Sequence, residues 1–465
     1  MRDLFFVLTR NAIGRAGMAL TTASGILFAF LVGLEIAGRS HGPYFGILTY
    51  LGVPALFVLG LLLIPFGVWR ERGRARGAAA GAGPGAALPV VDLNVERTRR
   101  IVVSFLVLTS VNLLVLGFAT HKSVEVMDST RFCGTTCHTI MEPEYAGHQG
   151  SAHAGVRCVA CHIGPGGGWY VRAKVNGARQ AVEAILHTYA RPIPVPVRQL
   201  RPAGEICAQC HQPARDVGDR PRTIRERGED EANTPSERTL VMRIGGRHGD
   251  AATGIHWHAD PAVRVRYHSD AMRRAIDVVE VTQPGRPVET YRLRTPETPA
   301  GGAARSADVA DQAGEWRVMD CVDCHNRVAH PARTPEREVD DAIDRNRIDA
   351  TLPFVRRESV RLLREACSTR EPDSDCATGL RAFYEKQYPD LATSKKDAIA
   401  AAGRTLAGLG ARNVFPAMAV TWGTYPSHLG HMETPGCFRC HDGEHVTSEG
   451  KSIGQDCGSC HSEPA

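Results

Sequence analysis

Five copies of one short pattern constrain this chain more than any other feature. Each has a cysteine, two other residues, a second cysteine and a histidine. The copies occupy residues 158–162, 207–211, 321–325, 437–441 and 457–461, and a sixth copy with a three-residue spacer occupies 133–138. The spacing lets two thiols add to the two vinyl groups of one haem, with the histidine beneath the iron. Zinc knuckles and disulfides also use paired cysteines, but neither requires a histidine directly after the second cysteine.

The pattern therefore predicts six covalent c-type haems, numbered here by motif order from residue 133 onward. The predicted attachment sites are Cys133, Cys137, Cys158, Cys161, Cys207, Cys210, Cys321, Cys324, Cys437, Cys440, Cys457 and Cys460. The predicted proximal iron ligands are His138, His162, His211, His325, His441 and His461.

Three apolar runs, 18–37, 44–69 and 101–119, lie in the first 120 residues. A helix of about 20 apolar residues is long enough to cross a bilayer. We therefore expect residues 1–120 to form a membrane region with three transmembrane helices, and residues 70–97 to form a cytoplasmic linker.

Arginine distribution predicts the orientation of these helices. Arg2, Arg10 and Arg15 precede the first run, and seven more arginines lie between Arg70 and Arg100. Short loops rich in arginine stay in the cytoplasm. The residues after the third run then face the bacterial periplasm, and the protein belongs to the inner membrane. The formal net charge of +5 is offset by haem propionates, so nucleic-acid binding gains no support.

Cys367 and Cys376 are the two cysteines outside the haem motifs. In an oxidising compartment such a pair is expected to form a disulfide. A seventh haem with an unusual spacer is the alternative.

The remaining pattern divides the chain after the membrane region. Residues 121–211 hold the first three motifs and a predicted helix at 170–189. Alternating runs in 212–320, at 239–244, 263–268, 276–281 and 289–294, predict a small antiparallel sheet. Residues 321–420 hold the fourth motif and predicted helices at 339–348, 355–366 and 398–406. A final di-haem segment spans 421–465. The expected fold is a membrane-anchored multihaem cytochrome, mostly helical and irregular around its haems, with a small β insert.

An electron-transfer haem normally has both axial positions filled, so the proximal histidines call for further ligands. Thirteen of the 19 histidines lie outside the motifs, because six are proximal. The candidates for the distal positions are Met141, His153, His187, His256, His258, His330, His431 and His445.

The third apolar run and the segment after it resemble the NapC/NirT family of membrane-anchored multihaem quinol dehydrogenases. The likeness covers roughly residues 97–211. It is carried by Cys-Gly-Thr-Thr-Cys-His-Thr-Ile-Met-Glu-Pro at 133–143, Ser151-Ala-His153, the second motif, and Lys174 upstream of His187. The remainder is similar to larger inner-membrane cytochromes of metal-respiring bacteria.

The resemblance implies a haem cluster that takes electrons from membrane quinol and passes them to periplasmic partners. It also implies a lysine and an acid near the quinol. Lys174 fits the lysine, and Glu183 is the nearest acid, since Gln180 and Ala181 occupy the expected region. The first motif departs from the family pattern, because its spacer is one residue longer and Met141 falls three residues after His138. The Ser-x-His pattern favours His153 over His148.

Three functions remain open at this point. The leading hypothesis is an inner-membrane quinol dehydrogenase, with menaquinol as the expected substrate, that supplies periplasmic acceptor cytochromes in anaerobic or metal respiration. The second is an electron-transfer subunit docked on a membrane complex. The third is a multihaem reductase of a small nitrogen or sulfur oxyanion, which needs one haem with an open distal site. Whether the protein forms a homo-oligomer or a membrane complex is also open.

Overall fold

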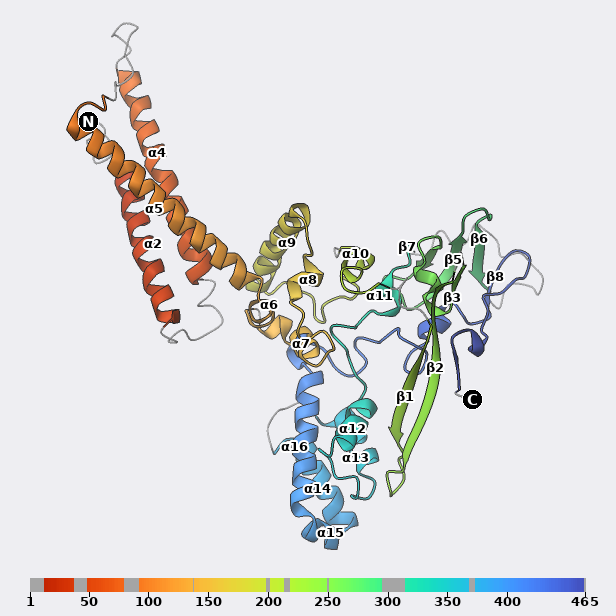
Figure 1. Ribbon diagram of the computed structural model, residues 1–465. Coiled ribbons are helices and arrows are strands. Elements are labelled where there is room, and N and C mark those ends of the chain that lie inside the picture. Colours follow the sequence, from red (N-terminus) through yellow and green to blue (C-terminus); the bar gives the residue numbers. More distant parts are fainter. Residues whose placement is uncertain are drawn as a thin grey trace. The chain divides into compact units, whose positions relative to one another are not determined.

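The computed structural model describes residues 12–36, 48–78, 92–136, 138–197, 201–212, 218–248, 251–294, 314–367 and 373–463 (Figure 1). The chain divides into two compact units, Met1–Thr136 and Cys137–Ala465.

The first unit is helical. Its elements are α2 (Ala12–Ile36), the π-helical turn η1 (Leu48–Gly52), α4 (Val53–Ala78), α5 (Glu96–Met127) and α6 (Thr130–Thr135). Helices α2 and α4 approach closely at two glycines: a Cβ added to Gly17 would lie 2.8 Å from the Gly60 carbonyl oxygen. A Cβ on Gly60 would lie 2.7 Å from the backbone nitrogen of Thr21. Small residues at a helix contact are typical of helix pairs in membranes.

Two described segments, Ala12–Leu34 and Leu48–Gly67, are long and apolar enough to cross a membrane. They overlap the first two predicted spans. The third predicted span, 101–119, lies inside the longer helix α5, where Leu113, Leu114 and Phe118 are exposed. It remains a prediction.

The linker predicted at 70–97 is shorter than expected at both ends. Helix α4 continues to Ala78, and α5 begins at Glu96. Alanine, arginine and glutamate are good helix formers, which explains why α4 runs past its apolar part. Residues 79–91 lie outside the described residues.

Around the haem motifs the second unit is made of short helices. They are α7 (His138–Gln149), α8 (Cys158–His162), α9 (Gly167–Ile185), α10 (Ala203–Cys207), α11 (Cys321–Cys324), η4 (Gly436–Arg439) and η5 (Cys457–Ser459). A single helical turn suits the motif, because residues three and four apart share one face of a helix. Asp320 caps α11 through a capping box with Asp323, and Asp456 accepts a hydrogen bond from the Gly458 backbone at η5.

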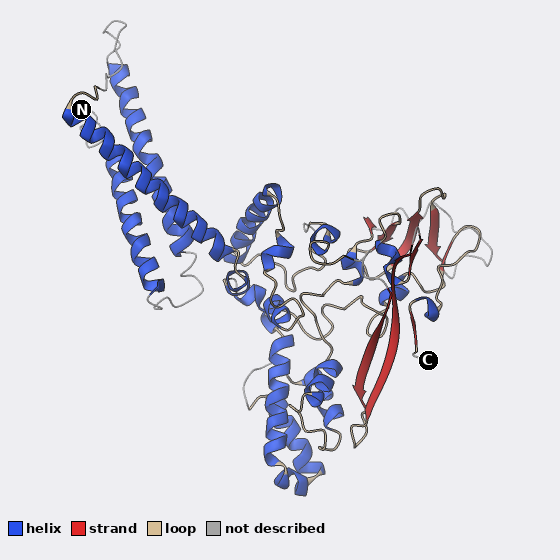
Figure 2. Cartoon of the chain, viewed as in Figure 1, coloured by secondary structure: helices blue, strands red, loops and turns tan. Residues whose placement is uncertain are grey.

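Two small antiparallel sheets follow (Figure 2). The first contains β1 (Gly218–Arg227), β2 (Pro235–His248), β3 (Ala251–Thr253) and β9 (His461–Ser462), and the turn η2 (Ile255–Ala259) follows β3. The second has the order β7 (Glu315–Val318), β4 (Arg264–Ser269), β5 (Ile276–Thr282), β6 (Glu289–Leu293) and β8 (His445–Val446). The C-terminal segment supplies β8 and β9, so it completes both sheets of the predicted insert rather than standing apart from it.

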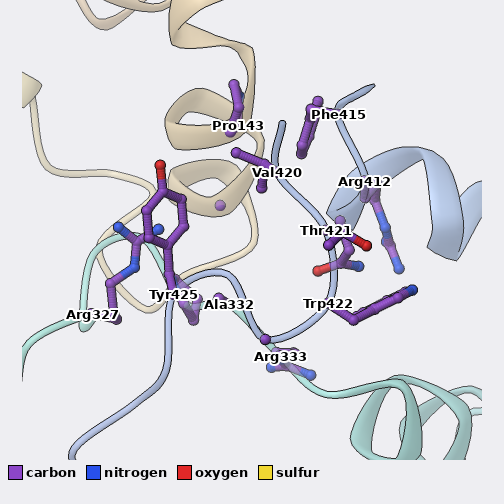
Figure 3. A pocket seen from close by; sticks show the side chains of 14 residues that line it. Pro143, Arg327, Ala332, Arg333, Arg412, Phe415, Val420, Thr421, Trp422 and Tyr425 are labelled. Atoms are coloured by element: carbon purple, nitrogen blue, oxygen red, sulfur yellow. The ribbon is translucent and has the colours of Figure 1, made fainter. Parts of the chain in front are cut away.

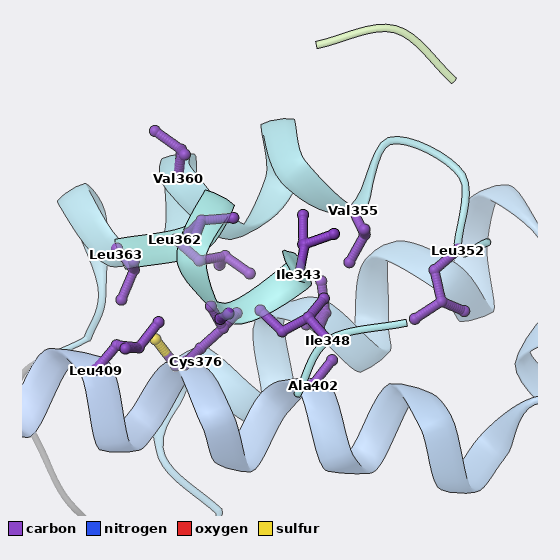
Figure 4. Close-up of a cluster of buried hydrophobic side chains, with 14 of the residues drawn as sticks. Ile343, Ile348, Leu352, Val355, Val360, Leu362, Leu363, Cys376, Ala402 and Leu409 are labelled. Atoms are coloured by element: carbon purple, nitrogen blue, oxygen red, sulfur yellow. The ribbon is translucent and has the colours of Figure 1, made fainter. Parts of the chain in front are cut away.

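A helical bundle without haem motifs forms the largest core. It comprises α12 (Pro335–Asp344), α13 (Val355–Glu365), α14 (Asp375–Gln387), α15 (Pro389–Ser394) and α16 (Lys396–Asn413). Figure 4 shows its buried side chains, among them Leu352, Ile343 and Cys376. Cys376 forms a disulfide with Cys367, with the Cα atoms 5.1 Å apart. Each fully buried aliphatic side chain contributes about 1.5–3 kcal/mol, so this bundle has a core of its own.

Candidate haem centres

Five motif histidines each face one histidine from elsewhere in the second unit. The ring centroids are 6.1 Å apart for His162 and His330, 6.1 Å for His211 and His153, 6.4 Å for His325 and His256, 5.9 Å for His441 and His258, and 6.2 Å for His461 and His431. Metal–imidazole nitrogen bonds are about 2 Å, so one metal ion held between two such rings separates their centroids by about 6 Å. The residues therefore fit a haem iron between the two rings of each pair.

Backbone carbonyls orient three of these rings. The Nδ1 atoms of His330, His258 and His441 donate to carbonyl oxygens at 2.8, 2.9 and 2.7 Å, respectively. Because a carbonyl oxygen only accepts, each Nδ1 carries the proton and Nε2 keeps its lone pair. This is the tautomer that a metal-binding histidine needs.

His153 and His256 differ from these three rings. Their Nδ1 atoms are buried and have no hydrogen-bond partner within the described part of the chain. An unsatisfied buried nitrogen costs about 1–3 kcal/mol. A bound haem, which brings an iron and two carboxylates to the site, is the kind of group that recovers this cost.

Burial favours the neutral form of several paired rings. It lowers the pKa of His162, His258, His325 and His330 below the usual value for histidine. A histidine must be neutral to bind a metal. The surroundings thus prepare these rings for coordination near neutral pH.

Loop 325–330 is tied to α7 next to the His162–His330 pair. A Cβ on Gly147 of α7 would lie 3.3 Å from the Cα atom of His330, so only glycine allows this approach without a shift. His330 donates to the backbone carbonyl of Glu144, whose carboxylate pairs with Arg327 at 3.3 Å. Helix α7 therefore positions the His330 ring through both its backbone and a partly buried ion pair.

Cysteines of successive motifs lie beside one another. In the haem-free chain the thiols of Cys207 and Cys321 interact, which lowers the pKa of Cys207 to about 7 and raises that of Cys321. Cys161 lies near enough to Cys207 for their charges to interact. In the same way Cys324 lies near Cys437, and Cys437 lies near Cys460. Motifs two to six thus follow one another in space in their sequence order.

Hydrogen bonds around Asp323 and Arg439 join motifs four and five. Asp323, inside motif four, is 1% exposed and accepts hydrogen bonds from the Tyr267 hydroxyl at 2.6 Å and from Arg273 at 2.7 Å. Arg439 stands at the equivalent position of motif five. It donates to the backbone carbonyls of Asp323 and Arg273, both at 2.7 Å.

Motifs three and four share a second carboxylate, Asp320. It accepts from the backbone nitrogens of Cys321 and Ala203, each at 2.6 Å, and so caps α10 and α11 together. The sequence prediction missed both Asp320 and Asp323. The opposite charges at the variable positions of motifs four and five are the one signal that pointed to such a link.

Two other histidines predicted as distal ligands, His445 and His187, do not belong to the five pairs. His445 has both ring nitrogens occupied, since Nδ1 meets the carboxylate of Asp442 at 3.0 Å and Nε2 meets the Ile276 carbonyl at 3.1 Å. Neither nitrogen is free for iron, so the prediction for His445 does not fit the structure. His187 is exposed and its ring stacks near Tyr189, with centroids 6.4 Å apart.

The structure describes only part of the first motif. Cys133 lies on α6, and Met141 is half-buried on α7. Cys137 and the side chain of His138 lie outside the described residues. The ligands of the first haem therefore remain predictions.

The two residues predicted to contact quinol do not act together. Lys174 and Glu183 are nine positions apart on α9, which places them half a rotation apart and about 13 Å along the axis. The Lys174 ammonium lies 4.9 Å from the centre of the Tyr170 ring, and Glu183 pairs with Arg179 at 3.1 Å. One quinol ring cannot contact both side chains.

A small pocket lies between α7 and the loops that carry Arg327 and Tyr425 (Figure 3). Its other lining residues include Trp422, Arg333 and Arg412. It has about 30 Å³ of space for water-sized molecules, whereas small-molecule sites occupy about 300–1,000 Å³. This pocket is too small for a quinol.

Comparison with known proteins identifies the family of this chain. The profile of the NapC/NirT cytochrome c family, N-terminal region, matches residues 96–193. The cytochrome c-type protein ImcH of Geobacter sulfurreducens is 40% identical over 456 residues, which cover 97% of this chain and 87% of that protein. The chain belongs to the NapC/NirT cytochrome c family. This confirms the family resemblance seen in residues 97–211.

Membership in this cytochrome family implies covalently bound haem and a role in electron transfer. NapC/NirT cytochromes are anchored in a membrane, in keeping with the apolar helices of the first unit. No solved structure matches the chain.

Proposed function

We propose that this cytochrome oxidises membrane quinol, with menaquinol as the expected substrate, and relays the electrons through six haems to periplasmic acceptor proteins. The observation that carries the proposal is the set of five histidine pairs. A haem with two histidine ligands has no open position for a substrate, which suits it to electron transfer.

Each pair joins a motif histidine to one distal ring. His330 serves motif two, His153 motif three, His256 motif four, His258 motif five and His431 motif six. The bound haem irons supply reversible one-electron transfer. The polypeptide holds the haems by their cysteines, orients the rings and keeps successive attachment sites side by side.

The order of the motifs supports a relay in which electrons enter at one end of the series and leave at the other. Electrostatic interactions between cysteines link each motif to the next from motif two to motif six. Motif one begins at Cys133, six residues after the end of α5 at Met127. Quinol is confined to the bilayer, so the haem nearest a membrane helix is the natural point of entry.

The histidine pairs also weigh against an oxyanion reductase. Such an enzyme needs an open iron, and five of the six motifs have a second histidine in place. An electron-transfer subunit of a membrane complex stays a second candidate, because Ile26, Phe30 and Leu62 of α2 and α4 are exposed and suit either lipid or another membrane protein.

Purified full-length protein in lipid nanodiscs provides the test. Under anaerobic conditions a menaquinol analogue should reduce the haems, and haem analysis should give six per chain. Low-temperature EPR should show low-spin iron with two imidazole ligands. Intact haems that dithionite reduces but quinol does not would refute quinol oxidation. A stable co-purifying membrane protein would then support the subunit reading, and a high-spin haem that binds nitrite would support the reductase.

A further inference from the structure

Helix α9 carries an apolar stripe that no described part of the chain covers. Val171, Val175, Val182 and Ile185 are 60%, 67%, 54% and 75% exposed. Their spacings of four, seven and three residues place them on one face of the helix. A surface helix of a water-soluble domain turns such a face toward the core, whereas α9 turns it outward.

The opposite face of α9 is the one that meets the protein. Trp169, Ala173 and Ala184 are half-buried, while the helix contains no fully buried residue. These three positions lie about 120–180° around the axis from Val175. The exposed stripe is therefore not simply the result of a detached helix.

Cations and aromatic rings border the stripe. Arg172 and Arg179 lie on one side of it, where Glu183 pairs with Arg179 at 3.1 Å, and Lys174 lies on the other side, all at about 40–100° from Val175. At the N-terminal end, Arg172 stacks over the Trp169 ring at 5.2 Å and Lys174 over the Tyr170 ring at 4.9 Å. Helices that lie in a membrane interface have this composition, with basic residues beside an apolar face and aromatic rings at headgroup level.

We infer that α9 lies in the plane of the membrane interface, with its stripe in the acyl boundary and its cations at anionic lipid headgroups. The occupant of this face is thus lipid rather than a protein chain, because the flanking charges match anionic headgroups. The inference rests on the membrane anchoring in the proposed function but not on quinol oxidation. It adds a second membrane contact directly after motif two.

Photolabelling of the full-length protein in nanodiscs tests this placement. A diazirine probe confined to the acyl region should label α9 at Val182 and Ile185, which fall in the single tryptic peptide 180–198 because trypsin does not cleave the Arg191–Pro192 bond. Helix α14 of the haem-free bundle, whose apolar face is buried in the bundle core, provides the unlabelled reference. Labelled transmembrane helices with an unlabelled stripe would overturn the inference, and so would a crosslink from the stripe to a protein chain.

A matched pair of variants sharpens the test. Val182→Glu puts a charge in the stripe, and Gln180→Glu puts the same charge on the side that faces away from it. Val182→Glu should reduce labelling of peptide 180–198 roughly fivefold or more, while Gln180→Glu should leave it unchanged. Equal labelling of both variants would contradict the inference. Labelling that follows this pattern in a protein that fails to oxidise quinol would sink the proposed substrate and leave the membrane contact standing.

Discussion

In the helical bundle of residues 335–413, Leu352, Leu380 and Leu406 are completely buried, whereas α8, which carries the second motif, contains no buried residue. The bundle has an apolar core made of its own side chains. The motif segments have single helical turns, polar links and facing histidines instead. The contrast indicates that haem supplies the apolar centre that these segments lack. Within one unit, the bundle is therefore stabilised by its own apolar core and the motif segments are stabilised by haem.

Loss of haem should produce the largest difference in stability between the motif segments and the bundle. In protein produced without haem attachment, segments 158–211 and 421–463 should lose their structure because nothing replaces the missing centre. The bundle helices α12 to α16 should remain folded. Hydrogen exchange measured by mass spectrometry checks this, and equal protection of the motif segments with and without haem would contradict it.

Asp323→Ala tests the polar links on the haem side. It leaves Arg273 buried without its partner, and breaking a buried ion pair costs about 3–5 kcal/mol. The free energy of unfolding of the motif region should fall by that amount, measured by denaturant titration of haem absorbance. The exposed Glu449→Ala variant is the control and should change little.

Leu406→Ala tests the bundle in the same way. Removing a fully buried leucine typically costs about 2–5 kcal/mol. The loss should appear in hydrogen exchange of α12 to α16 and leave the haem midpoint potentials unchanged. Leu429→Ala removes a half-exposed leucine near motif five and should cost far less. A similar loss for both variants would mean that the two regions share one core.

The smallest effect concerns pH. Burial lowers the pKa of His428 to about 4, below the value of about 6.5 in an unfolded chain. Since the folded state resists protonation, its contribution is complete above about pH 6.5 and is lost as the pH falls toward 4. We expect a loss of about 1–3 kcal/mol in the motif region. His428→Gln should flatten this dependence, and an unchanged slope would contradict the assignment.

Local patterns predicted the regular elements well. Predicted strands at 263–268, 276–281 and 289–294 correspond to β4, β5 and β6, and the predicted helix 355–366 corresponds to α13. Helix α14 was missed, because its Gly379 and mixed polarity weaken the helical period. The edge strands β8 and β9 could not be foreseen, since two residues each carry no alternation.

The distal ligands show where sequence reasoning ends. Proximity to a motif favoured His445, but Asp442 and the Ile276 carbonyl occupy its nitrogens. His330 follows motif four in sequence and yet faces His162 of motif two. Partners of this kind are decided by tertiary packing, such as the approach of Gly147 to His330, which leaves no local signature.

The turn η2 has a consequence for the whole relay. His256 and His258 are two residues apart on it, yet they face His325 and His441 of two different motifs. Residues two apart on a 3₁₀ turn point about 120° away from each other, so in the proposed relay five residues of backbone would hold the fourth and fifth haem irons at one separation. Electron transfer along a series of haems depends on the spacing between each haem and the next. Any distortion of this one turn would therefore disturb two haem positions at once.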